Sequence, residues 1–227
     1  MSEAQLESGC GMDSSVKHHK ASEYWKKVPA TLEGVLGGYP ELTKVDLRSS
    51  KNFLENLLKK FNITDCYDRA LDCGAGIGRV TQGLLVQLYN KVDLVEMCQK
   101  FLDEVPKYVN SAEKIGTLYC SSLQTFTPQK ALYDVIWIQW VVNYLADADL
   151  VSFLIRCKLG LKQNGFIIIK ENVSSTQLVT DSKDGGMTRT AEHFKKVFKA
   201  AKLVLLVEET QKNFPKELFL VKMFALR

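Results

Sequence analysis

The stretch Arg69-Ala-Leu-Asp-Cys-Gly-Ala-Gly-Ile-Gly-Arg79 decides the fold of this chain of 227 residues. It begins as a short apolar strand that ends at Asp72, and three glycines follow at alternate positions, Gly74, Gly76 and Gly78. A helix is expected to begin at Arg79. A glycine-rich turn between a strand and the N-terminus of a helix lets a ligand approach the bare backbone. We therefore predict a ligand site at this turn.

The spacing of the glycines separates this turn from two well-known phosphate-binding loops. The dinucleotide fingerprint has two residues between its last two glycines, whereas this turn has one. The turn also lacks the lysine of a P-loop. An acidic residue just before a Gly-x-Gly-x-Gly turn resembles motif I of S-adenosylmethionine-dependent methyltransferases of the seven-stranded type. A tight turn whose glycines serve only packing is the alternative.

Two further predicted strands end in polar or aromatic residues. The strand Lys91–Glu96 ends in an acid, 22 residues after Gly74. In doubly wound folds such an acid binds a ribose diol, which both NAD and S-adenosylmethionine contain. The strand 133–140 is almost continuously apolar, as a buried parallel strand should be, and it ends at Gln139 and Trp140. Ligands bind outside the carboxyl ends of such strands, so these side chains are candidates for a site.

The order of the predicted elements indicates one α/β domain. Residues 1–20 are polar and predict a flexible tail, and residues 21–62 predict a helical cap. In the core, 63–227, five strands alternate with helices, and two more strands follow at 203–208 and 218–225. This pattern predicts a doubly wound, mostly parallel seven-stranded sheet with an N-terminal helical cap and a C-terminal antiparallel hairpin.

The composition limits the possible partners. The chain is 46% hydrophobic, which suffices for a core, and its net charge of +4 gives no reason to expect nucleic-acid binding. Six cysteines without a C-x-x-C pair and three histidines argue against a metal site and for reduced thiols. Residues 1–19 contain no apolar h-region of a signal peptide, and the longest apolar run, 135–146, is too short to span a bilayer. We expect a soluble monomer of the nucleus and cytoplasm, with no nucleic-acid or membrane partner.

Several stretches together resemble one family of enzymes. From about Ser22 to the C-terminus the chain resembles eukaryotic α-N-terminal protein methyltransferases, which methylate proteins that begin Xaa-Pro-Lys after loss of the initiator Met. The resemblance implies a single methyltransferase domain over 21–227, with S-adenosylmethionine as methyl donor and S-adenosylhomocysteine as product. It rests on Tyr24-Trp25, Leu36-Gly37-Gly38-Tyr39, Leu71–Arg79, Phe126-Thr127-Pro128, Tyr133–Trp140, Lys170-Glu171-Asn172 and Phe224–Arg227.

The resemblance implies a set of residues that bind the cofactor. They are Gly74, Arg79, Glu96, Met97, Cys98, Leu123, Gln124 and Gln139, with Trp25 as a cover. The chemistry agrees, because the guanidinium of Arg79 can pair with the methionine carboxylate and is aided by the helix N-terminus. Glu96 would hold the ribose, although the family more often has Asp at that position.

The resemblance also implies a set of residues that bind the peptide. They are Tyr24, Leu36, Trp140, Asn172, Asp181 and Asp184, with Leu218 as an apolar wall. Aromatic surface suits a proline ring, and carboxylates suit a lysine side chain and an incoming ammonium group. The long polar stretch 173–189 also favours a substrate-binding loop. We expect Asp184 to act as the base and Asn172 to orient the amine.

The chain departs from the family pattern at two places. It has Asn143-Tyr144-Leu145 where the family has Gly-His-Leu, and Asp184-Gly185-Gly186 where the family has Asp-Ser-Ser. The family histidine is associated with proton removal, whereas a tyrosine with an ordinary pKa near ~10 is a poor base at neutral pH. We therefore hypothesise that Tyr144, in this catalytic position, changes the rate or the number of methyl groups added.

Three other functions stay open from the sequence. A methyltransferase for a small-molecule amine or hydroxyl would share the fold and the cofactor, but it would be indifferent to proline at the second peptide position. A weakly active binder of protein N-termini would keep Trp140 and Asn172 but bind the cofactor weakly. An NAD oxidoreductase is disfavoured by the spacing of the glycines.

Overall fold

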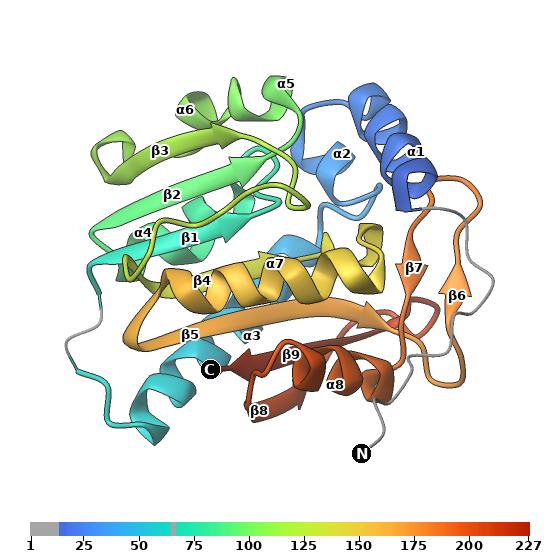
Figure 1. Ribbon diagram of the computed structural model, residues 1–227. Coiled ribbons are helices and arrows are strands. Elements are labelled where there is room, and N and C mark those ends of the chain that lie inside the picture. The colour runs from blue at the N-terminus through green and yellow to red at the C-terminus, as the bar shows by residue number, and fades with distance from the viewer. Residues whose placement is uncertain (1–13, 65–66) are drawn as a thin grey trace, which may run out of the picture.

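Seven strands form one sheet in the computed structural model, which describes residues 14–64 and 67–227 (Figure 1). Their order is β3-β2-β1-β4-β5-β9-β8. The first five strands pair in parallel, whereas β9 pairs antiparallel with both β5 and β8. The predicted fold class is therefore confirmed. The strands are β1 Arg69–Cys73, β2 Lys91–Glu96, β3 Ile115–Cys120, β4 Tyr133–Gln139, β5 Leu161–Val173, β8 Leu205–Thr210 and β9 Leu220–Leu226.

Both faces of the sheet are covered by helices, as a parallel sheet requires. Figure 1 shows α7 (Asp147–Gly160) and α8 (Ala191–Ala200) in front of the sheet and α3 (Leu42–Lys60) behind it. All of β4 is buried, and its side chains alternate between the two layers. Ile136 and Ile138 pack in the α7 and α8 layer, whereas Val135 and Trp137 pack in the α3 layer.

Helix α3 starts at Leu42, so Ser49 and Ser50 lie inside it. Buried polar side chains persist within α3 because partners on the sheet satisfy them. For example, the Ser50 hydroxyl accepts a hydrogen bond from Lys170 Nζ at 2.9 Å.

The helix predicted to begin at Arg79 begins there and runs to Leu88. Its middle, Thr81–Leu85, is a π-helix, and α4 spans Val86–Leu88. Gly83 lies in the π-helix, and a Cβ at this position would come within 2.2 Å of Leu47 Cδ1 on α3. The glycine therefore permits the close approach of this segment to α3.

The region predicted as a helical cap, 21–62, divides into two parts. Helices α1 (Ser14–Lys27) and α2 (Leu32–Val35) lie beyond the carboxyl ends of β1 and β2 in Figure 1 and are called the cap from here on, whereas α3 covers one face of the sheet. Thr31 caps α2, because its side chain accepts a hydrogen bond from the amide of Gly34 at 3.1 Å. Most of the predicted flexible tail, residues 1–13, lies outside the described residues. Residues 14–20 of that predicted tail belong to α1.

The remaining elements are short. They are α5 (Gln99–Leu102), α6 (Val105–Tyr108), 3₁₀ turns at Ala112–Lys114 and Val142–Tyr144, and a separate antiparallel ribbon of β6 (Val179–Thr180) and β7 (Met187–Thr188). The ribbon lies within the predicted polar loop 173–189, beyond the end of β5 in Figure 1. This loop therefore has regular structure at its centre.

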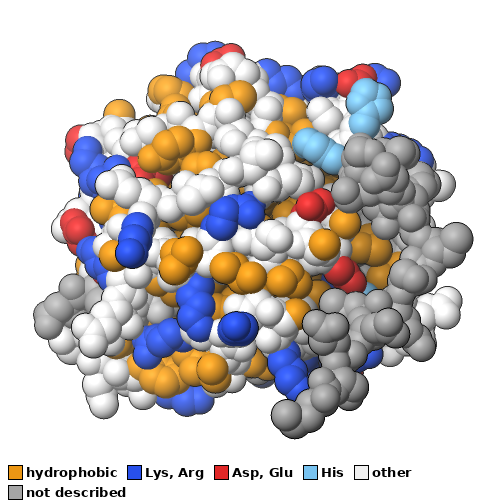
Figure 2. All heavy atoms as spheres, viewed as in Figure 1, with side chains coloured by type: hydrophobic (Ala, Val, Ile, Leu, Met, Phe, Trp, Pro, Cys, Tyr) orange, Lys and Arg blue, Asp and Glu red, His pale blue; other side chains and the backbone are white. Residues whose placement is uncertain are grey.

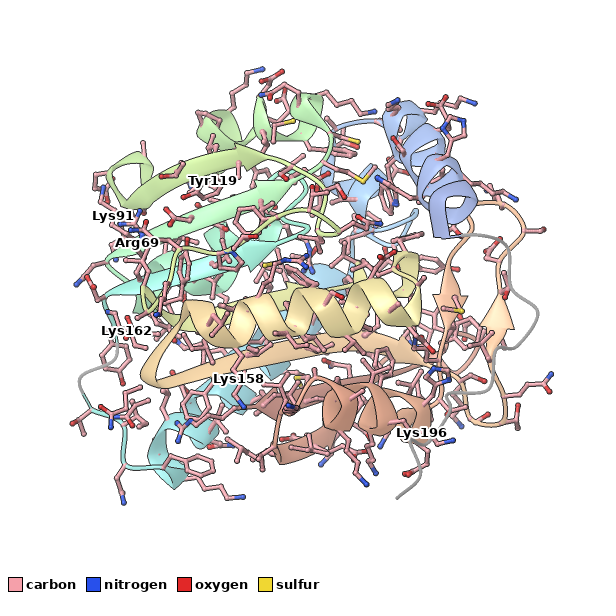
Figure 3. All side chains as sticks on the ribbon, viewed as in Figure 1. Arg69, Lys91, Tyr119, Lys158, Lys162 and Lys196 are labelled. Carbon is pink, nitrogen blue, oxygen red and sulfur yellow. The ribbon has the colours of Figure 1, made fainter. Side chains whose placement is uncertain are left out.

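Ion pairs hold the edge of the sheet where the parallel strands begin. Arg69 pairs with Asp93 at 2.7 Å, and the Tyr133 hydroxyl donates to the same carboxylate at 2.9 Å. Figure 3 shows Arg69, Lys91 and Lys162 at this edge, away from α1 and α2. On the α7 face, apolar and basic side chains are intermixed (Figure 2). These features are structural, and the site lies at the other edge of the sheet.

Candidate active site

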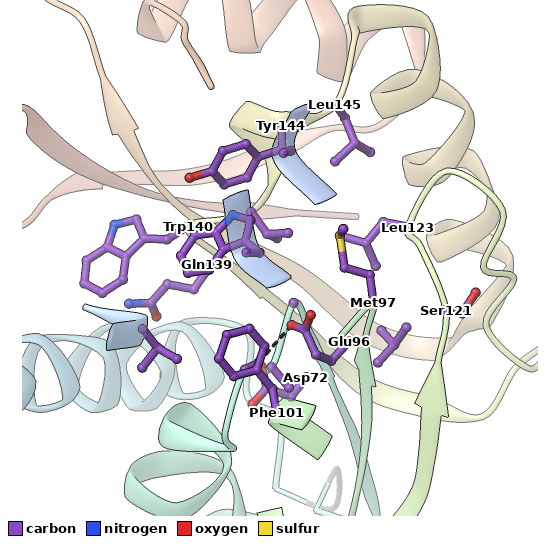
Figure 4. Close-up of a pocket in the computed structure, with 18 of the residues that line it drawn as sticks. Asp72, Glu96, Met97, Phe101, Ser121, Leu123, Gln139, Trp140, Tyr144 and Leu145 are labelled. Carbon is purple, nitrogen blue, oxygen red and sulfur yellow. Dashed lines mark hydrogen bonds between the residues drawn. The ribbon is translucent and has the colours of Figure 1, made fainter. Parts of the chain in front are cut away.

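A pocket lies at the carboxyl ends of β1, β2 and β4, where the order of the strands reverses (Figure 4). We call it the inner pocket. Its volume is about 970 Å³, which includes space open to solvent. Eight of the nine residues predicted to bind the cofactor line it: Trp25, Gly74, Arg79, Glu96, Met97, Leu123, Gln124 and Gln139. Cys98 is the exception, and its side chain packs with Ile77 and Phe101.

The glycine turn forms one wall of the inner pocket. Gly74 has φ +67°, and a Cβ there would come within 2.7 Å of Val141. Two amides at this wall donate to Glu96, from Gly76 at 3.1 Å and from Cys98 at 2.9 Å. Burial raises the pKa of Glu96, and these two hydrogen bonds favour its charged form. Glu96 therefore joins the glycine turn to the start of α5.

Asp72, beside Glu96 in Figure 4, has a different task. Its Oδ2 accepts hydrogen bonds from the Thr81 hydroxyl at 2.7 Å and the Thr81 amide at 3.1 Å. Burial raises the pKa of Asp72 to about 6. The acid before the glycines thus fixes the start of the following helix.

The opposite wall is a loop that α7 holds in place. One terminal nitrogen of Arg156 donates to the carbonyl oxygens of Leu123 and Gln124, each at 2.8 Å. The Arg156 Nε donates to the carbonyl of Phe126 at 2.8 Å. The Leu123 and Gln124 side chains, one apolar and one an amide, therefore line the pocket from a backbone that Arg156 holds in place.

A buried cluster of charges stands behind the inner pocket. Lys170 and Asp46 are both fully buried, and Lys170 Nζ lies 2.6 Å from Asp46 Oδ1. Arg79 donates to Asp46 Oδ2 at 2.7 Å, and Gln139 Nε2 donates to both carboxylate oxygens at 3.0 Å. Burial alone would raise the pKa of Asp46, but Lys170 and Arg79 outweigh it and lower the pKa. The cluster ties α3 to the strand ends.

Sequence reasoning missed this cluster, in which Arg79 also takes part. The guanidinium is bound to Asp46 and lies 5.1 Å from the centre of the Trp140 ring. It is therefore held in one orientation between the two predicted sets of residues. Asp46 gave no signal, because a lone acid in a helix is most often exposed.

A second hollow adjoins the inner pocket, and we call it the outer cleft. All seven residues predicted to bind a peptide line it: Tyr24, Leu36, Trp140, Asn172, Asp181, Asp184 and Leu218. Four residues line both hollows: Trp25, Val35, Trp140 and Tyr144. These four mark the boundary at which a ligand in one hollow would meet a ligand in the other.

Aromatic contacts and an unusual backbone shape this boundary. Trp25 packs edge-on against Tyr144, with ring centres 5.8 Å apart, and against Phe101 at 6.2 Å. The backbone of Trp140 has φ +53°, a left-handed conformation that residues other than glycine rarely adopt. Its amide donates to the carbonyl of Lys170 at 3.0 Å. Such strain is typical of residues that a site needs in a fixed place.

The two departures from the family pattern meet at one carboxylate. The Tyr144 hydroxyl donates to Asp184 Oδ2 at 2.8 Å, and the Gly186 amide donates to Oδ1 at 2.8 Å. A Cβ at Gly186 would lie 3.4 Å from Tyr144 Cε1 and 3.0 Å from Asp184 Oδ1. A side chain at this position would therefore crowd the Asp184 carboxylate, whereas its distance from the tyrosine ring is close to an ordinary van der Waals contact. Burial and then Asp184 raise the pKa of Tyr144 well above its ordinary value, so this phenol is a donor and not a base.

Glu171 is a second residue that sequence reasoning missed. It lines the outer cleft, is 1% exposed, and accepts hydrogen bonds from the amides of Val142 at 3.1 Å and Asn172 at 2.8 Å. Burial raises its pKa to about 7, which is the range of an effective general base. Its position at the end of β5, next to Asn172, was the available signal.

The described residues, 14–64 and 67–227, show no other reactive centre of a familiar kind. No group of three or more metal-binding side chains occurs among them, and none of their helices is long and apolar enough to cross a membrane. Cys73, Cys98, Cys120 and Cys157 are free thiols, whereas Cys10 and Cys66 lie outside the described residues.

Comparison with known proteins shows the family to which this chain belongs. A family model described as AdoMet dependent proline di-methyltransferase matches residues 13–227. The chain belongs to this family. It is 44% identical to the N-terminal Xaa-Pro-Lys N-methyltransferase 1-B of Xenopus laevis and 40% identical to the N-terminal Xaa-Pro-Lys N-methyltransferase 1 of Homo sapiens. Each match covers 95% of this chain and 97% of the relative.

Solved structures agree with this membership of the AdoMet-dependent proline di-methyltransferase family. A SAM-dependent methyltransferase of Leishmania major superposes with a TM-score of 0.86 at 38% identity, over 93% of this chain and 83% of that one. A phosphoethanolamine N-methyltransferase of Haemonchus contortus has a TM-score of 0.75 at 15% identity, over 95% of this chain and 50% of that one. The second likeness shows the fold alone.

Proposed function

We propose that this chain transfers a methyl group from S-adenosylmethionine to the α-amino group of proteins with an exposed N-terminal Xaa-Pro-Lys motif. The observation that carries the proposal is the meeting of two hollows across Trp25, Trp140 and Tyr144. One hollow has an acidic, an apolar and an amide side chain suited to a nucleoside, and the other has aromatic and acidic groups. The names of the two relatives given above describe the same reaction.

The side chains of the inner pocket fit S-adenosylmethionine. Glu96 can accept hydrogen bonds from a ribose diol with lone pairs that its two amide partners leave free. Leu123 and Gln124 provide an apolar wall and an amide for the adenine. Arg79 uses one terminal nitrogen for Asp46, so its other donors can reach a carboxylate. The bound cofactor would supply a methyl group on a positively charged sulfur.

The outer cleft fits the first residues of the substrate. The Trp140 ring offers a flat surface for proline, and Asp181 and Asp184 offer carboxylates for the lysine side chain and the incoming ammonium group. Asn172 orients the amine. Such positioning supplies most of the acceleration in a direct displacement, which needs the amine lone pair in line with the methyl group.

The amine must also lose a proton before it reacts. An α-amino group titrates near pH ~8, so a minority is already neutral at pH 7. We assign proton removal to Asp184, which the Tyr144 hydroxyl and the Gly186 amide hold in place. Glu171 at the buried end of the cleft is the second candidate. A pH–rate profile of Asp184→Asn against Glu171→Gln distinguishes them, because only loss of the true base removes the acid limb.

The experiment that tests the proposed function uses peptides and mass spectrometry. The protein is incubated with S-adenosylmethionine and an Xaa-Pro-Lys peptide, and with a control peptide in which alanine replaces the proline. We expect methylation of the α-amine of the first peptide and little of the second. Equal methylation of both would favour a less selective amine methyltransferase, and no mass gain with tight peptide binding would favour a silent binder of N-termini.

The proposal includes the location and assembly of the protein. We propose a monomer of the nucleus and cytoplasm without nucleic-acid or membrane partners. The modest net charge of +4 supports only the expected lack of a nucleic-acid partner. We also treat residues 21–227 as one methyltransferase domain, to which α1 adds residues 14–20. Sedimentation velocity and imaging of the tagged full chain test the assembly and the location.

A further inference from the structure

Large apolar side chains gather at the mouth of the outer cleft. Tyr39, Val179 and Phe219 line the cleft, yet they are 38%, 37% and 45% exposed. Leu178 and Leu220, the chain neighbours of Val179 and Phe219, are also exposed but do not line the cleft. We call Tyr39, Val179 and Phe219 the apolar rim. Single exposed apolar side chains are common on proteins, but a group of them around a cleft marks a binding surface.

The apolar rim is built from three separate parts of the chain. Tyr39 comes from the turn between α2 and α3, Val179 begins β6, and Phe219 immediately precedes β9. Side chains from such distant segments meet around the cleft only because the fold brings them there.

Burial shows which end of the cleft is closed. Glu171, Val221 and Asn143 also line the cleft, and they are 1%, 3% and 8% exposed. The boundary with the inner pocket, at Trp140 and Tyr144, adjoins this buried end. A polypeptide whose N-terminus reaches that boundary must therefore leave the cleft at its exposed end, past the apolar rim.

We infer that the apolar rim binds an apolar side chain among the fourth to sixth residues of the substrate protein. This inference rests on the proposed function. A residue before proline is restricted to extended conformations, and proline has a fixed φ, so the substrate enters the cleft extended. At about 3.3 Å per residue, three residues occupy about 10 Å, and the next residues pass the rim.

The β6–β7 ribbon suits an extended partner. Within the described part of the chain, β6 pairs with β7 on one side only, through Val179 with Thr188 and Thr180 with Met187. Its other edge offers unpaired backbone groups beside the exposed Val179 side chain. Extended peptides commonly bind to such edges, with affinity from the backbone and selectivity from the side chains.

The test compares three substrates that share the same Xaa-Pro-Lys start. One is the tripeptide amide, one is a hexapeptide with leucine, phenylalanine and valine at positions four to six, and one is a hexapeptide with serine there. We expect the native protein to prefer the apolar hexapeptide by about tenfold in kcat/KM, mainly through KM, because one apolar side chain becomes partly buried. The tripeptide is the reference, so each result is a ratio of hexapeptide to tripeptide.

Variants connect the preference to the apolar rim. Val179→Ser and Phe219→Ser should each lose most of the tenfold preference. Ile155→Ser and Leu159→Ser are matched controls, because these α7 residues are also large, apolar and exposed, at 43% and 60%, but do not line the cleft. The controls should keep the full preference.

Several outcomes would overturn the inference. Equal kcat/KM for both hexapeptides in the native protein would do so, as would an unchanged preference in both rim variants. A native dimer that Phe219→Ser converts to a monomer in sedimentation would assign the rim to a second copy of the chain. If none of the three peptides is methylated, the proposed function fails, and calorimetric binding of the two hexapeptides then decides on the rim alone.

Discussion

The inner pocket and the outer cleft are built in different ways. The inner pocket takes its walls from the ends of neighbouring parallel strands, and backbone features such as the turn at Gly74 shape it. The outer cleft collects side chains from the cap, the end of β5, the β6–β7 ribbon and the segment before β9. The comparison teaches that the fold class fixes the cofactor half of the site, whereas contacts between distant side chains fix the substrate half.

The largest expected effect lies in the charge cluster behind the inner pocket. Asp46→Ala leaves Lys170 buried without its partner and frees Arg79, so we expect a loss of about 3–5 kcal/mol in the free energy of unfolding. Denaturant unfolding measures it, with the exposed Asp181→Ala as control. A loss below about 1 kcal/mol, the size of a surface effect, would show that the cluster is not structural.

The same cluster predicts how stability depends on acid. The folded pKa of Asp46 lies below its ordinary 3.8, so its contribution is present above that value and is lost as the pH falls through the folded pKa. Between pH 5 and 2, the free energy of unfolding should therefore decrease more steeply with falling pH for the native chain than for Asp46→Ala.

Glu171 predicts the opposite pH dependence in the outer cleft. Its pKa is raised from 4.5 to about 7, so the protonated form stabilises the fold below pH 4.5 and this contribution is lost as the pH rises through 7. The shift corresponds to about 3 kcal/mol. In Glu171→Gln this fall between pH 4.5 and 7 should be absent from denaturant unfolding curves, and an unchanged fall would assign it to another group.

Gly74→Ala tests the inner pocket with a smaller effect. A Cβ would meet the branched side chain of Val141 while φ stays positive, so we expect about 2 kcal/mol of destabilisation. The dissociation constant for S-adenosylhomocysteine, measured by calorimetry, should rise at least about tenfold. Gly37→Ala is the matched control, because Gly37 also has a positive φ but a Cβ there would meet no atom of the described residues within 4 Å. Equal effects of both variants would rule out the contact with Val141 as the cause.

These two regions also differ in how much of them could be predicted from the sequence. The strands, the glycine turn and Glu96 were predictable because their signals are local spacings. The pairing of Asp46 with Lys170 joins residues 124 positions apart, and no local pattern reports it. Glu171 had a signal in its place after β5, but its burial and raised pKa come from neighbours in three dimensions. The shared contact of Tyr144 and Gly186 with Asp184 likewise appears only in the folded chain.

The smallest effects concern that shared contact. Tyr144→Phe removes one hydrogen bond to Asp184, which should cost about 1 kcal/mol, or about fivefold in kcat/KM for an Xaa-Pro-Lys peptide. Gly186→Ser alone should reduce activity because its Cβ would come within 3.0 Å of Asp184 Oδ1, which Tyr144 also holds, whereas Tyr144→His with Gly186→Ser should recover it. Additive effects in this double-mutant cycle would mean that the two positions are independent.

Tyr144→His also tests whether the tyrosine changes the outcome of the reaction. We expect the variant to differ from the native protein in rate or in the distribution of mono-, di- and trimethylated peptide, read by mass spectrometry over time. Equal progress to the trimethylated product by both proteins would contradict this hypothesis.

The central claim is that the cofactor occupies the inner pocket and the substrate N-terminus meets it at Trp140 and Tyr144. A crystal structure of the full chain with S-adenosylhomocysteine and an Xaa-Pro-Lys peptide tests this claim most directly. The account predicts the ribose at Glu96, the proline against Trp140, and the α-amine beside Asn172 and Asp184 at the boundary. A peptide bound elsewhere, or an α-amine directed away from the inner pocket, would contradict it.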